Sequence, residues 1–404
     1  MPNCLICEKE FKPFVNFGQM PIANAFATID DIKNEYTFLM KVGFCDNCNM
    51  VQLVEQPDRE KMFHENYAFF SSTSSYMREH FKQFANSVSN LQDLSKSSFV
   101  VELGCNDGIL LENYIKDNIP CLGVEPSKNG ANVAISKGIE VINQFFDENL
   151  AEKILHSHKK ADAILSANVI CHIPYMHSIF GGVKKLLNEN GVFIFEDPYL
   201  GEIIEKTSFD QIYDEHVFLF STLSVSYLAN MHDLELINVE PQITHGGSMR
   251  YTIAHKGIKT ISENVVNLIN NEIKLGLDKE QSYLGFTDSV NKIKNDLIDL
   301  LIKLKNDGKK VVAYGATSKS TTVTNYFGIN PELIHCIYDN TPIKQNKFSP
   351  GVHIPVLPYD QFRDSNPDYV LLFAWNHSAE IMAKEKDYMN NRHWIIYVPD
   401  VKVI

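Results

Sequence analysis

Apolar segments alternate with helical stretches along most of the chain, and this alternation restricts the possible folds more than any other feature of the sequence. In the first half, short apolar segments at 99–103, 122–124, 163–166 and 192–195 are separated by stretches with the periodicity of amphipathic helices. Parallel strands cannot be joined by tight turns and need crossover connections, which are usually helices. The pattern therefore predicts a parallel sheet covered by helices on both faces.

The same alternation returns near the end of the chain, after a helical and charged stretch at 258–306. Further strand candidates lie at 311–315, 334–338, 369–373 and 394–398. We therefore expect an α/β protein with one doubly wound domain over residues 67–257 and a second over residues 258–404.

Residues 1–66 form a separate unit that contains two Cys-x-x-Cys pairs and would have only a marginal core of its own. The pairs are Cys4 with Cys7 and Cys45 with Cys48. Four thiolates in two such pairs can complete the tetrahedral shell of Zn²⁺, which leaves no position open for catalysis. Four unligated cysteines and a redox-active pair are the alternatives, and we favour structural zinc.

The charge balance and the short apolar runs exclude several classes of protein. A net charge of -13 and an isoelectric point near 5.5 oppose the basic surface that nonspecific nucleic-acid binding requires. The first ten residues lack the apolar core of a signal peptide, and apolar runs such as 369–375 are too short to cross a bilayer. We expect a cytoplasmic monomer without a nucleic-acid or membrane partner.

A glycine-bearing turn follows the first predicted strand and can bring the backbone close to a nucleotide-like ligand. Its acidic, amide and glycine residues are Glu102, Gly104, Asn106, Asp107 and Gly108. Glu125 follows the next strand, where an acidic side chain can accept hydrogen bonds from both hydroxyls of a ribose. Glu102 and Asp107 would repel a pyrophosphate, whereas S-adenosylmethionine carries a cationic sulfur and an amino group. We therefore expect S-adenosylmethionine, with a turn that binds nothing as the alternative.

A second small-residue turn follows the strand candidate at 311–315 and carries Ser318 and Lys319 at the expected start of a helix. Backbone N–H groups, the helix dipole and the lysine together suit a phosphate group. Asn376 follows another strand candidate, and open α/β sheets bind ligands at the carboxyl ends of their strands. The single glycine of this turn is equally compatible with a plain tight turn.

Several segments accompany the cysteine pairs in a fixed order, at 102–108, 167–174, 196–199, 212–216, 245–250, 313–319 and 373–377. Over essentially the whole chain they resemble the three-domain C-methyltransferases that act on nucleotide-linked 4-keto deoxysugars. The resemblance implies an N-terminal zinc-binding module, a central class I S-adenosylmethionine-dependent methyltransferase domain with a Rossmann-like fold, and a C-terminal Rossmann-like domain that helps hold the nucleotide sugar. It also implies proton abstraction beside a ketone, an enolate, and methyl transfer from sulfur to carbon.

The resemblance also assigns roles to individual residues. His216 is expected to be the general base, with Tyr213, Glu215 and His172 beside it in the catalytic site. Asn168 is expected to bind the cofactor. The residues expected to bind the substrate are Tyr67 or Tyr76, Arg250, Ser318, Lys319 and Asn376.

Several alternatives remain open at this point. Taken alone, His216 also fits a core histidine with satisfied hydrogen bonds, and the surrounding motifs favour the base. The acidic neighbour Asp214 would raise the pKa of His216 and strengthen it as a base, unless the carboxylate points into solvent. An O-methyltransferase acting on a sugar, or a catalytically silent sugar-nucleotide-binding protein, are the alternative functions. Glu125 and His216 argue against the silent protein.

Overall fold

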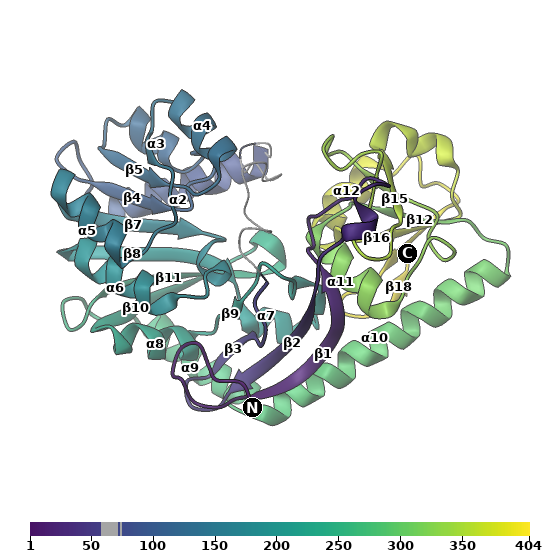
Figure 1. The fold of residues 1–404 in the computed structure, drawn as a ribbon, viewed down its shortest axis with the longest axis horizontal. Helices are drawn as coiled ribbons and strands as arrows, with labels where there is room; N and C mark the ends of the chain where they lie inside the picture. The colour runs from purple at the N-terminus through teal and green to yellow at the C-terminus, as the bar shows by residue number, and fades with distance from the viewer. Residues whose placement is uncertain (58–71, 73–74) are drawn as a thin grey trace.

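The computed structural model describes residues 1–57, 72 and 75–404, which form three β-sheets and the helices that cover them (Figure 1). An N-terminal sheet lies between two α/β units, and the long helix α10 (Glu280–Asn306) runs along the lower edge of Figure 1. Within the described ranges, no helix has the length and apolar character to span a bilayer. The α/β class expected from the sequence is confirmed.

The central unit is built on a seven-stranded sheet in the order β10-β11-β8-β7-β4-β5-β6. Along the chain its strands are β4 (Val100–Leu103), β5 (Cys121–Val124), β6 (Glu140–Ile142), β7 (Ala161–Ala167), β8 (Leu187–Pro198), β10 (Leu234–Gln242) and β11 (Ser248–His255). Strands β4 to β8 are parallel, and β11 pairs antiparallel with both β8 and β10. The strand order reverses between β4 and β7, which is where open α/β sheets bind ligands.

Helices cover both faces of the central sheet. The residues of its middle strands β4 and β5 are therefore all buried. Apolar side chains of α2, α3 and α4 form one core, and those of α5, α6, α8 and α9 contribute to the other. The helices of this unit are α2 (Ser75–Gln92), α3 (Leu111–Lys116), α4 (Lys128–Ser136), α5 (Glu148–Ser157), α6 (Met176–Leu186), α7 (Leu200–Glu205) and α8 (Thr222–Met231), and α9 (Glu263–Leu275) follows β11.

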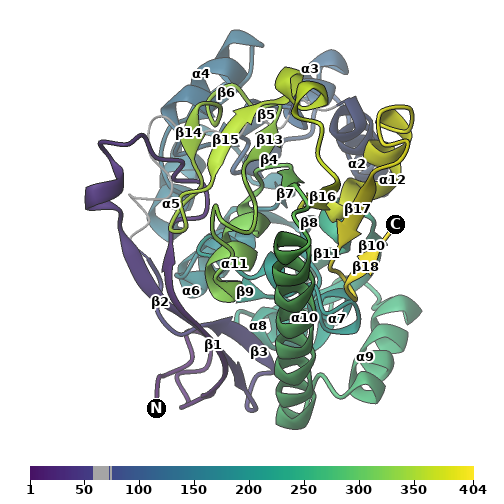
Figure 2. The ribbon, with the colours of Figure 1, turned by 90° about the vertical axis from the view of Figure 1, so that its right-hand side faces the viewer.

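The C-terminal unit has a second seven-stranded sheet, in the order β14-β15-β13-β12-β16-β17-β18. Its strands are β12 (Val311–Tyr314), β13 (Ile337–Asp339), β14 (Lys347–Phe348), β15 (Pro355–Pro358), β16 (Tyr369–Leu372), β17 (His393–Ile396) and β18 (Lys402–Val403). The five middle strands are parallel. Helices α10 and α11 (Ser318–Phe327) share one core with this sheet and lie close together in Figure 2, whereas α12 (Ser378–Lys384) packs at the other core.

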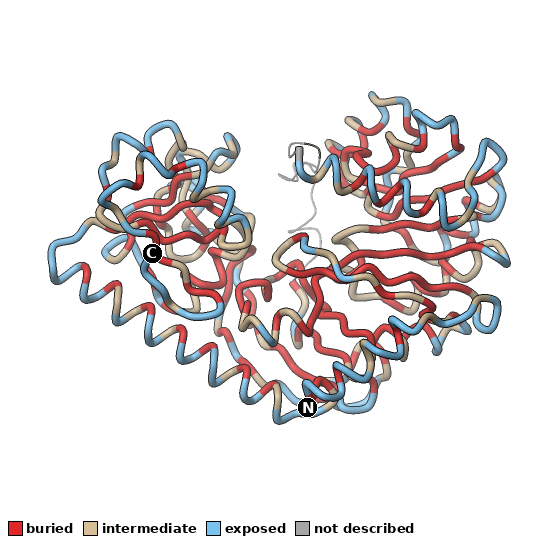
Figure 3. The backbone as a smooth tube through the Cα atoms, turned by 180° about the vertical axis from the view of Figure 1, so that it is seen from behind, coloured by how far each residue is buried: buried red, intermediate tan, exposed pale blue. Residues whose placement is uncertain are grey.

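The N-terminal sheet contains β1 (Lys12–Pro21), β2 (Thr37–Cys45), β3 (Met50–Leu53) and β9 (Phe218–Leu219), and the last of these comes from the central unit. The rings of Phe14 and Phe44 lie 5.0 and 4.5 Å from that of Tyr283 on α10. Figure 3 shows the resulting alternation of buried and exposed residues along α10. The core of the N-terminal sheet thus includes residues of the other two units. As a result, the chain segment after β1 lies where all three units meet.

Candidate active site

The cysteines of the two Cys-x-x-Cys pairs meet in one cluster at the end of the N-terminal sheet. Sγ of Cys4 lies 3.5 Å from Sγ of Cys48, and Sγ of Cys7 lies 3.4 Å from Sγ of Cys45. All four sulfur atoms lie within 4.8 Å of one another. Thiolates about 2.3 Å from a tetrahedral Zn²⁺ are separated by about 3.8 Å. The cluster therefore has the size and the donor set of a closed zinc shell.

Matching turns shape the two halves of this cluster. The residue after each pair has a left-handed backbone, with φ of 59° at Glu8 and 57° at Asn49. The N–H of Ile6 donates to Sγ of Cys4, 3.4 Å away. Each turn directs its two sulfur atoms toward those of the other pair, as one shared metal ion requires.

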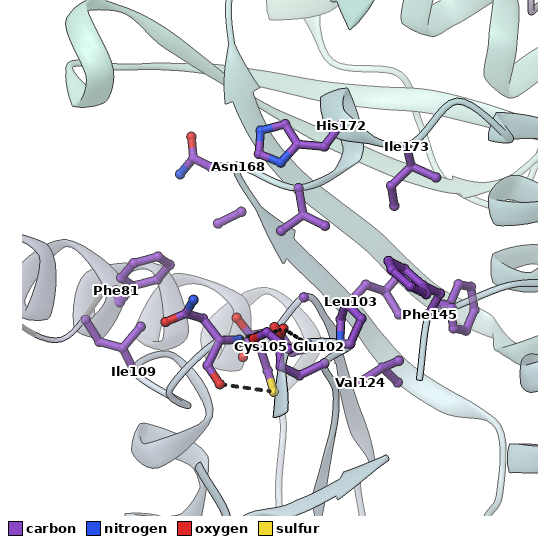
Figure 4. A pocket seen from close by; sticks show the side chains of 18 of the residues that line it. Phe81, Glu102, Leu103, Cys105, Ile109, Val124, Phe145, Asn168, His172 and Ile173 are labelled. Atoms are coloured by element: carbon purple, nitrogen blue, oxygen red, sulfur yellow. Dashed lines mark hydrogen bonds between the residues drawn. The ribbon is translucent and has the colours of Figure 1, made fainter. Parts of the chain in front are cut away.

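A cavity that is partly open to solvent lies at the carboxyl ends of β4, β5 and β7 (Figure 4). Six of the residues expected at the cofactor or catalytic site line it, namely Glu102, Gly104, Asn106, Glu125, Asn168 and His172. Asp107 and Gly108 are not among its lining residues. At Gly108, which has φ of +76°, an added Cβ would lie 2.3 Å from Cδ1 of Ile139. This glycine is required for packing behind the loop.

Buried carboxylates give one wall of the cavity its chemical character. Oε2 of Glu102 is buried and has no hydrogen-bond partner among the described residues. Burial, followed by the negative charges of Glu125 and Asp107, raises the pKa of Glu102 well above its usual range. A cationic ligand in the cavity would compensate this cost. The wall therefore fits the amino group of S-adenosylmethionine and disfavours a pyrophosphate.

Glu125 holds the loop after β4 in place. Its carboxylate accepts the N–H of Asn106 at 2.8 Å and the N–H and hydroxyl of Ser127 at 2.7 and 2.5 Å. Each carboxylate oxygen has two lone pairs, so these three bonds leave one acceptor position, on Oε2, for a ribose hydroxyl. Burial raises the pKa of Glu125, while the bonds to Ser127 and Asn106 oppose that shift.

Much of the cavity lining is apolar, and sequence reasoning missed this part of the site. The side chains come from α2 and from loops after β6 and β7, and they include Met77, Phe81, Phe145, Ile173 and Tyr175. Apolar walls around a few polar groups are typical of pockets for small ligands. No local pattern marks these residues, because an aromatic in a loop after a strand looks the same whether it packs in a core or lines a cavity.

The catalytic residues expected in the segment 212–216 gather beside this cavity. His216 is buried, and its ring lies 5.4 Å from that of His172 and 4.1 Å from that of Tyr213. Nδ1 of His216 lies 2.6 Å from the carbonyl oxygen of Gln211. A carbonyl can only accept, so the proton is on Nδ1 and Nε2 carries the lone pair. His172 lines the cavity and stacks on His216, so it links the two sites.

The histidines around the site are held neutral by burial. Burial, followed by the neighbouring His172, lowers the pKa of His216 well below its usual range. Burial also lowers the pKa of His172 to about 3 and that of His245 to about 4. The expectation that Asp214 raises the pKa of His216 is therefore wrong. The Asp214 carboxylate is buried and instead accepts the N–H of Ala23 at 2.8 Å.

The residues expected to bind the nucleotide sugar are distributed over two units. Nζ of Lys319 lies 4.6 Å from the centre of the Trp375 ring and donates to the carbonyl oxygen of His245, which lines the cavity. Ser318 begins α11 at the same junction, and Asn376 follows Trp375 and is half-buried. These groups therefore gather at the carboxyl ends of β12 and β16, as expected for an open sheet.

Arg250 has other partners than the expected sugar. Its Nε and Nη2 donate to Oε2 of Glu196 at 3.2 and 2.9 Å, and the guanidinium lies over the ring of Phe84. Oε1 of Glu196 contacts Nε2 of His80 at 2.8 Å. A direct contact between Arg250 and a sugar stays a prediction. Of the two tyrosines, Tyr76 is exposed on α2, and Tyr67 lies outside the described residues.

We predict that the purified protein contains one tightly held zinc ion per chain, bound by Cys4, Cys7, Cys45 and Cys48. Metal analysis together with thiol titration checks this. Replacing Cys45 by Ser should remove the zinc and destabilise the N-terminal module, because the ion contributes folding free energy. Replacing the scattered Cys336 by Ser is the matched control and should leave the zinc in place. Zinc-free wild-type protein with four freely titratable thiols would contradict the assignment.

We predict that Glu125→Ala weakens S-adenosylmethionine binding by about 2 kcal/mol, because a charge-assisted hydrogen bond to the ribose is lost. Isothermal titration calorimetry measures the change. Glu125→Gln, which keeps the shape of the side chain, separates loss of the charge from collapse of the loop. Glu140→Ala, at an exposed position on β6, is the control and should bind normally. Wild-type affinity in both Glu125 variants would refute the ribose role.

Three family models match the chain in order along its length. They are described as "Putative zinc binding domain" over residues 4–63, "Methyltransferase domain" over residues 74–239 and "C-methyltransferase C-terminal domain" over residues 243–399. The chain is also 30% identical over 406 residues to the C-methyltransferase NovU of Streptomyces niveus, across 100% of this chain and 96% of that protein.

Solved structures resemble part of the chain. The PH0226 protein of Pyrococcus horikoshii matches with 16% identity and a TM-score of 0.37, over 50% of this chain and all of that one. The magnesium protoporphyrin IX methyltransferase of Synechocystis, with bound SAH, matches with 13% identity and a TM-score of 0.36, over 44% of this chain and 83% of that one. The assignment rests on the full-length relative and on the ordered family models. By this evidence, the chain belongs to the family of S-adenosylmethionine-dependent C-methyltransferases.

Proposed function

We propose that this enzyme methylates the carbon next to the ketone of a nucleotide-linked 4-keto deoxysugar, with His216 as the general base. The observation that carries the proposal is the hydrogen bond from Nδ1 of His216 to the carbonyl oxygen of Gln211, 2.6 Å long. It keeps the lone pair on Nε2, in a buried and neutral ring beside the cofactor cavity. The ring also stacks on that of His172, which lines the cavity.

The ketone determines what else the site must supply. A proton on the neighbouring carbon is weakly acidic, so its abstraction needs both a positioned base and donors for the developing enolate oxygen. Tyr213 and His172, whose rings contact that of His216, are the candidate donors. Burial raises the pKa of the Asp214 carboxyl well above its usual range. Of the two neighbouring carboxyl groups, Glu215 is the candidate partner for a sugar hydroxyl.

The two α/β units divide the ligands between them. When bound in the central cavity, S-adenosylmethionine supplies an electrophilic methyl group on a cationic sulfur. In this proposal Lys319 and the backbone N–H of Ser318, at the start of α11, bind the phosphates of the sugar nucleotide, with Asn376 nearby at the carboxyl end of the C-terminal sheet. Arg250 remains a candidate contact to the sugar, and its ion pair with Glu196, which also accepts the hydroxyl of Thr244, holds the guanidinium in place. We also propose that the domain boundaries of the chain lie after residues 66 and 257.

A panel of nucleotide-linked keto sugars, incubated with enzyme and S-adenosylmethionine, tests the substrate class. We expect one or more of them to gain a methyl group bonded to carbon, which NMR distinguishes from a methyl group on oxygen. The same sugars reduced to alcohols at the ketone should not react, because they cannot form an enolate. Methylation of the reduced sugars, or an O-methyl product, would contradict the proposal and favour a sugar O-methyltransferase.

We predict that His216→Asn lowers kcat by roughly two to four powers of ten, the usual scale for removal of a general base. Binding of S-adenosylmethionine should change little, since His216 does not line the cofactor cavity. His156→Asn, at an exposed position on α5, is the matched control and should retain full activity. Near-wild-type turnover of His216→Asn would show that His216 is not the general base. His172 would then be the next candidate.

The buried position of His216 also predicts the pH dependence of turnover. Because its pKa is lowered from 6.5, the ring stays neutral on acidification through that pH and is protonated only when the pH falls through the lowered value. We expect kcat at pH 6 to remain within about twofold of its value at pH 7.5. A series of kcat measurements at constant ionic strength checks this. A half-loss of kcat near pH 6.5 would show an ordinary, solvated histidine instead.

A further inference from the structure

The side-chain amide of Asn24 joins polar groups of all three units. Asn24 lies after β1 of the N-terminal sheet, and its Nδ2 donates to Oε1 of Glu215 in the central unit at 2.8 Å. The hydroxyl of Ser318, at the start of α11 in the C-terminal unit, lies 3.1 Å from its Oδ1 and donates to it. Both ends of one amide are therefore used, each toward a different unit.

The backbone next to Asn24 is fixed in the same way. The N–H of Ala23 donates to Oδ1 of Asp214 at 2.8 Å, and the hydroxyl of Thr321 donates to the carbonyl oxygen of Ala23 at 3.0 Å. Ala23 itself is buried. The amide of Asn24 therefore has a defined position between the loop 212–216 and α11.

The chemistry of these contacts calls for an amide at this position. Glu215 needs a donor, Ser318 needs an acceptor, and of the short side chains only asparagine offers both on one rigid group. An aspartate would keep the acceptor for Ser318 but would place a second carboxylate against Glu215. Burial lowers the pKa of Lys344, and the negative charges of Asp339 and then Glu215 oppose that shift.

We propose that Asn24 is a positioning residue that holds the Glu215 carboxylate in the orientation that binds a hydroxyl of the sugar. The zinc-binding module then contributes Asn24 to the substrate site. The site is assembled only when Asn24 is hydrogen-bonded to Ser318 of the C-terminal unit. The inference rests on the proposed function, because it assigns the hydroxyl partner of Glu215. It does not extend to the cofactor cavity, which Asn24 does not line.

The test compares Asn24→Ala with Asn47→Ala in the full-length, zinc-containing enzyme. Asn47 lies in the same module and donates to the hydroxyl of Tyr227 in the central unit, so its substitution removes one amide contact across the interface, away from Glu215. We expect Asn24→Ala to lower kcat/KM for the keto sugar by about tenfold or more and Asn47→Ala by less than about twofold, with zinc content and S-adenosylmethionine affinity unchanged in both. Asn24→Asp should be worse than Asn24→Ala.

A double-mutant cycle with Glu215→Gln separates positioning from a general loss of stability. If Asn24 acts through the Glu215 carboxylate, Asn24→Ala should change kcat/KM by less than about twofold once Glu215 is already Gln. Equal losses in both backgrounds, or equal effects of Asn24→Ala and Asn47→Ala, would overturn the inference about Asn24. The proposed substrate class would not be affected. A wild-type enzyme that methylates no keto sugar would overturn the proposed function, and this inference with it.

Discussion

The structure depends on how the loop 208–216 satisfies its buried polar side chains. Buried carboxylates are costly unless they are hydrogen-bonded, and this loop carries three of them. Asp210 accepts from Nε1 of Trp375 and from the hydroxyl of Tyr397, both at 2.6 Å and both in the C-terminal unit. Asp214 and Glu215 accept from the chain after β1, in the N-terminal sheet. The loop that carries His216 is therefore held by hydrogen bonds from both neighbouring units.

The same constraint accounts for the electrostatics of the site. Burial keeps His172 and His216 neutral, as their proposed roles of donor and base require. In the cavity that His172 also lines, Oε2 of Glu102 has no hydrogen-bond partner in the described part of the chain, which favours a cationic ligand. In the proposed reaction, neutral histidines act on the reacting carbon, while acidic side chains face a cofactor whose sulfur is positively charged. His172 belongs to both parts, since it lines the cavity and stacks on His216.

The sequence supports those features that are local or periodic. The strands β4 and β12 were predictable from short apolar runs before a glycine turn, and Glu125 from its place after the next strand. The cysteine pairs predict a zinc shell because the Cys-x-x-Cys spacing is a local feature. It forms a turn that brings the two sulfur atoms of each pair together. Asn24 could not be found, because its partners lie 191 and 294 residues away and nothing local distinguishes it from any other loop asparagine. The direction in which Asp214 points depends likewise on a distant backbone N–H, and for that reason its expected effect on His216 was wrong.

The central claim is that His216 removes a proton from the carbon next to the ketone before a methyl group is transferred. The most direct measurement is the uptake of solvent deuterium at that carbon, followed by NMR, with S-adenosylhomocysteine in place of the methyl donor so that no transfer can occur. The account predicts that the wild-type enzyme exchanges the proton at a rate well above that of buffer, and that His216→Asn does not. Exchange that continues unchanged in His216→Asn would contradict the account, because a different group would then be removing the proton.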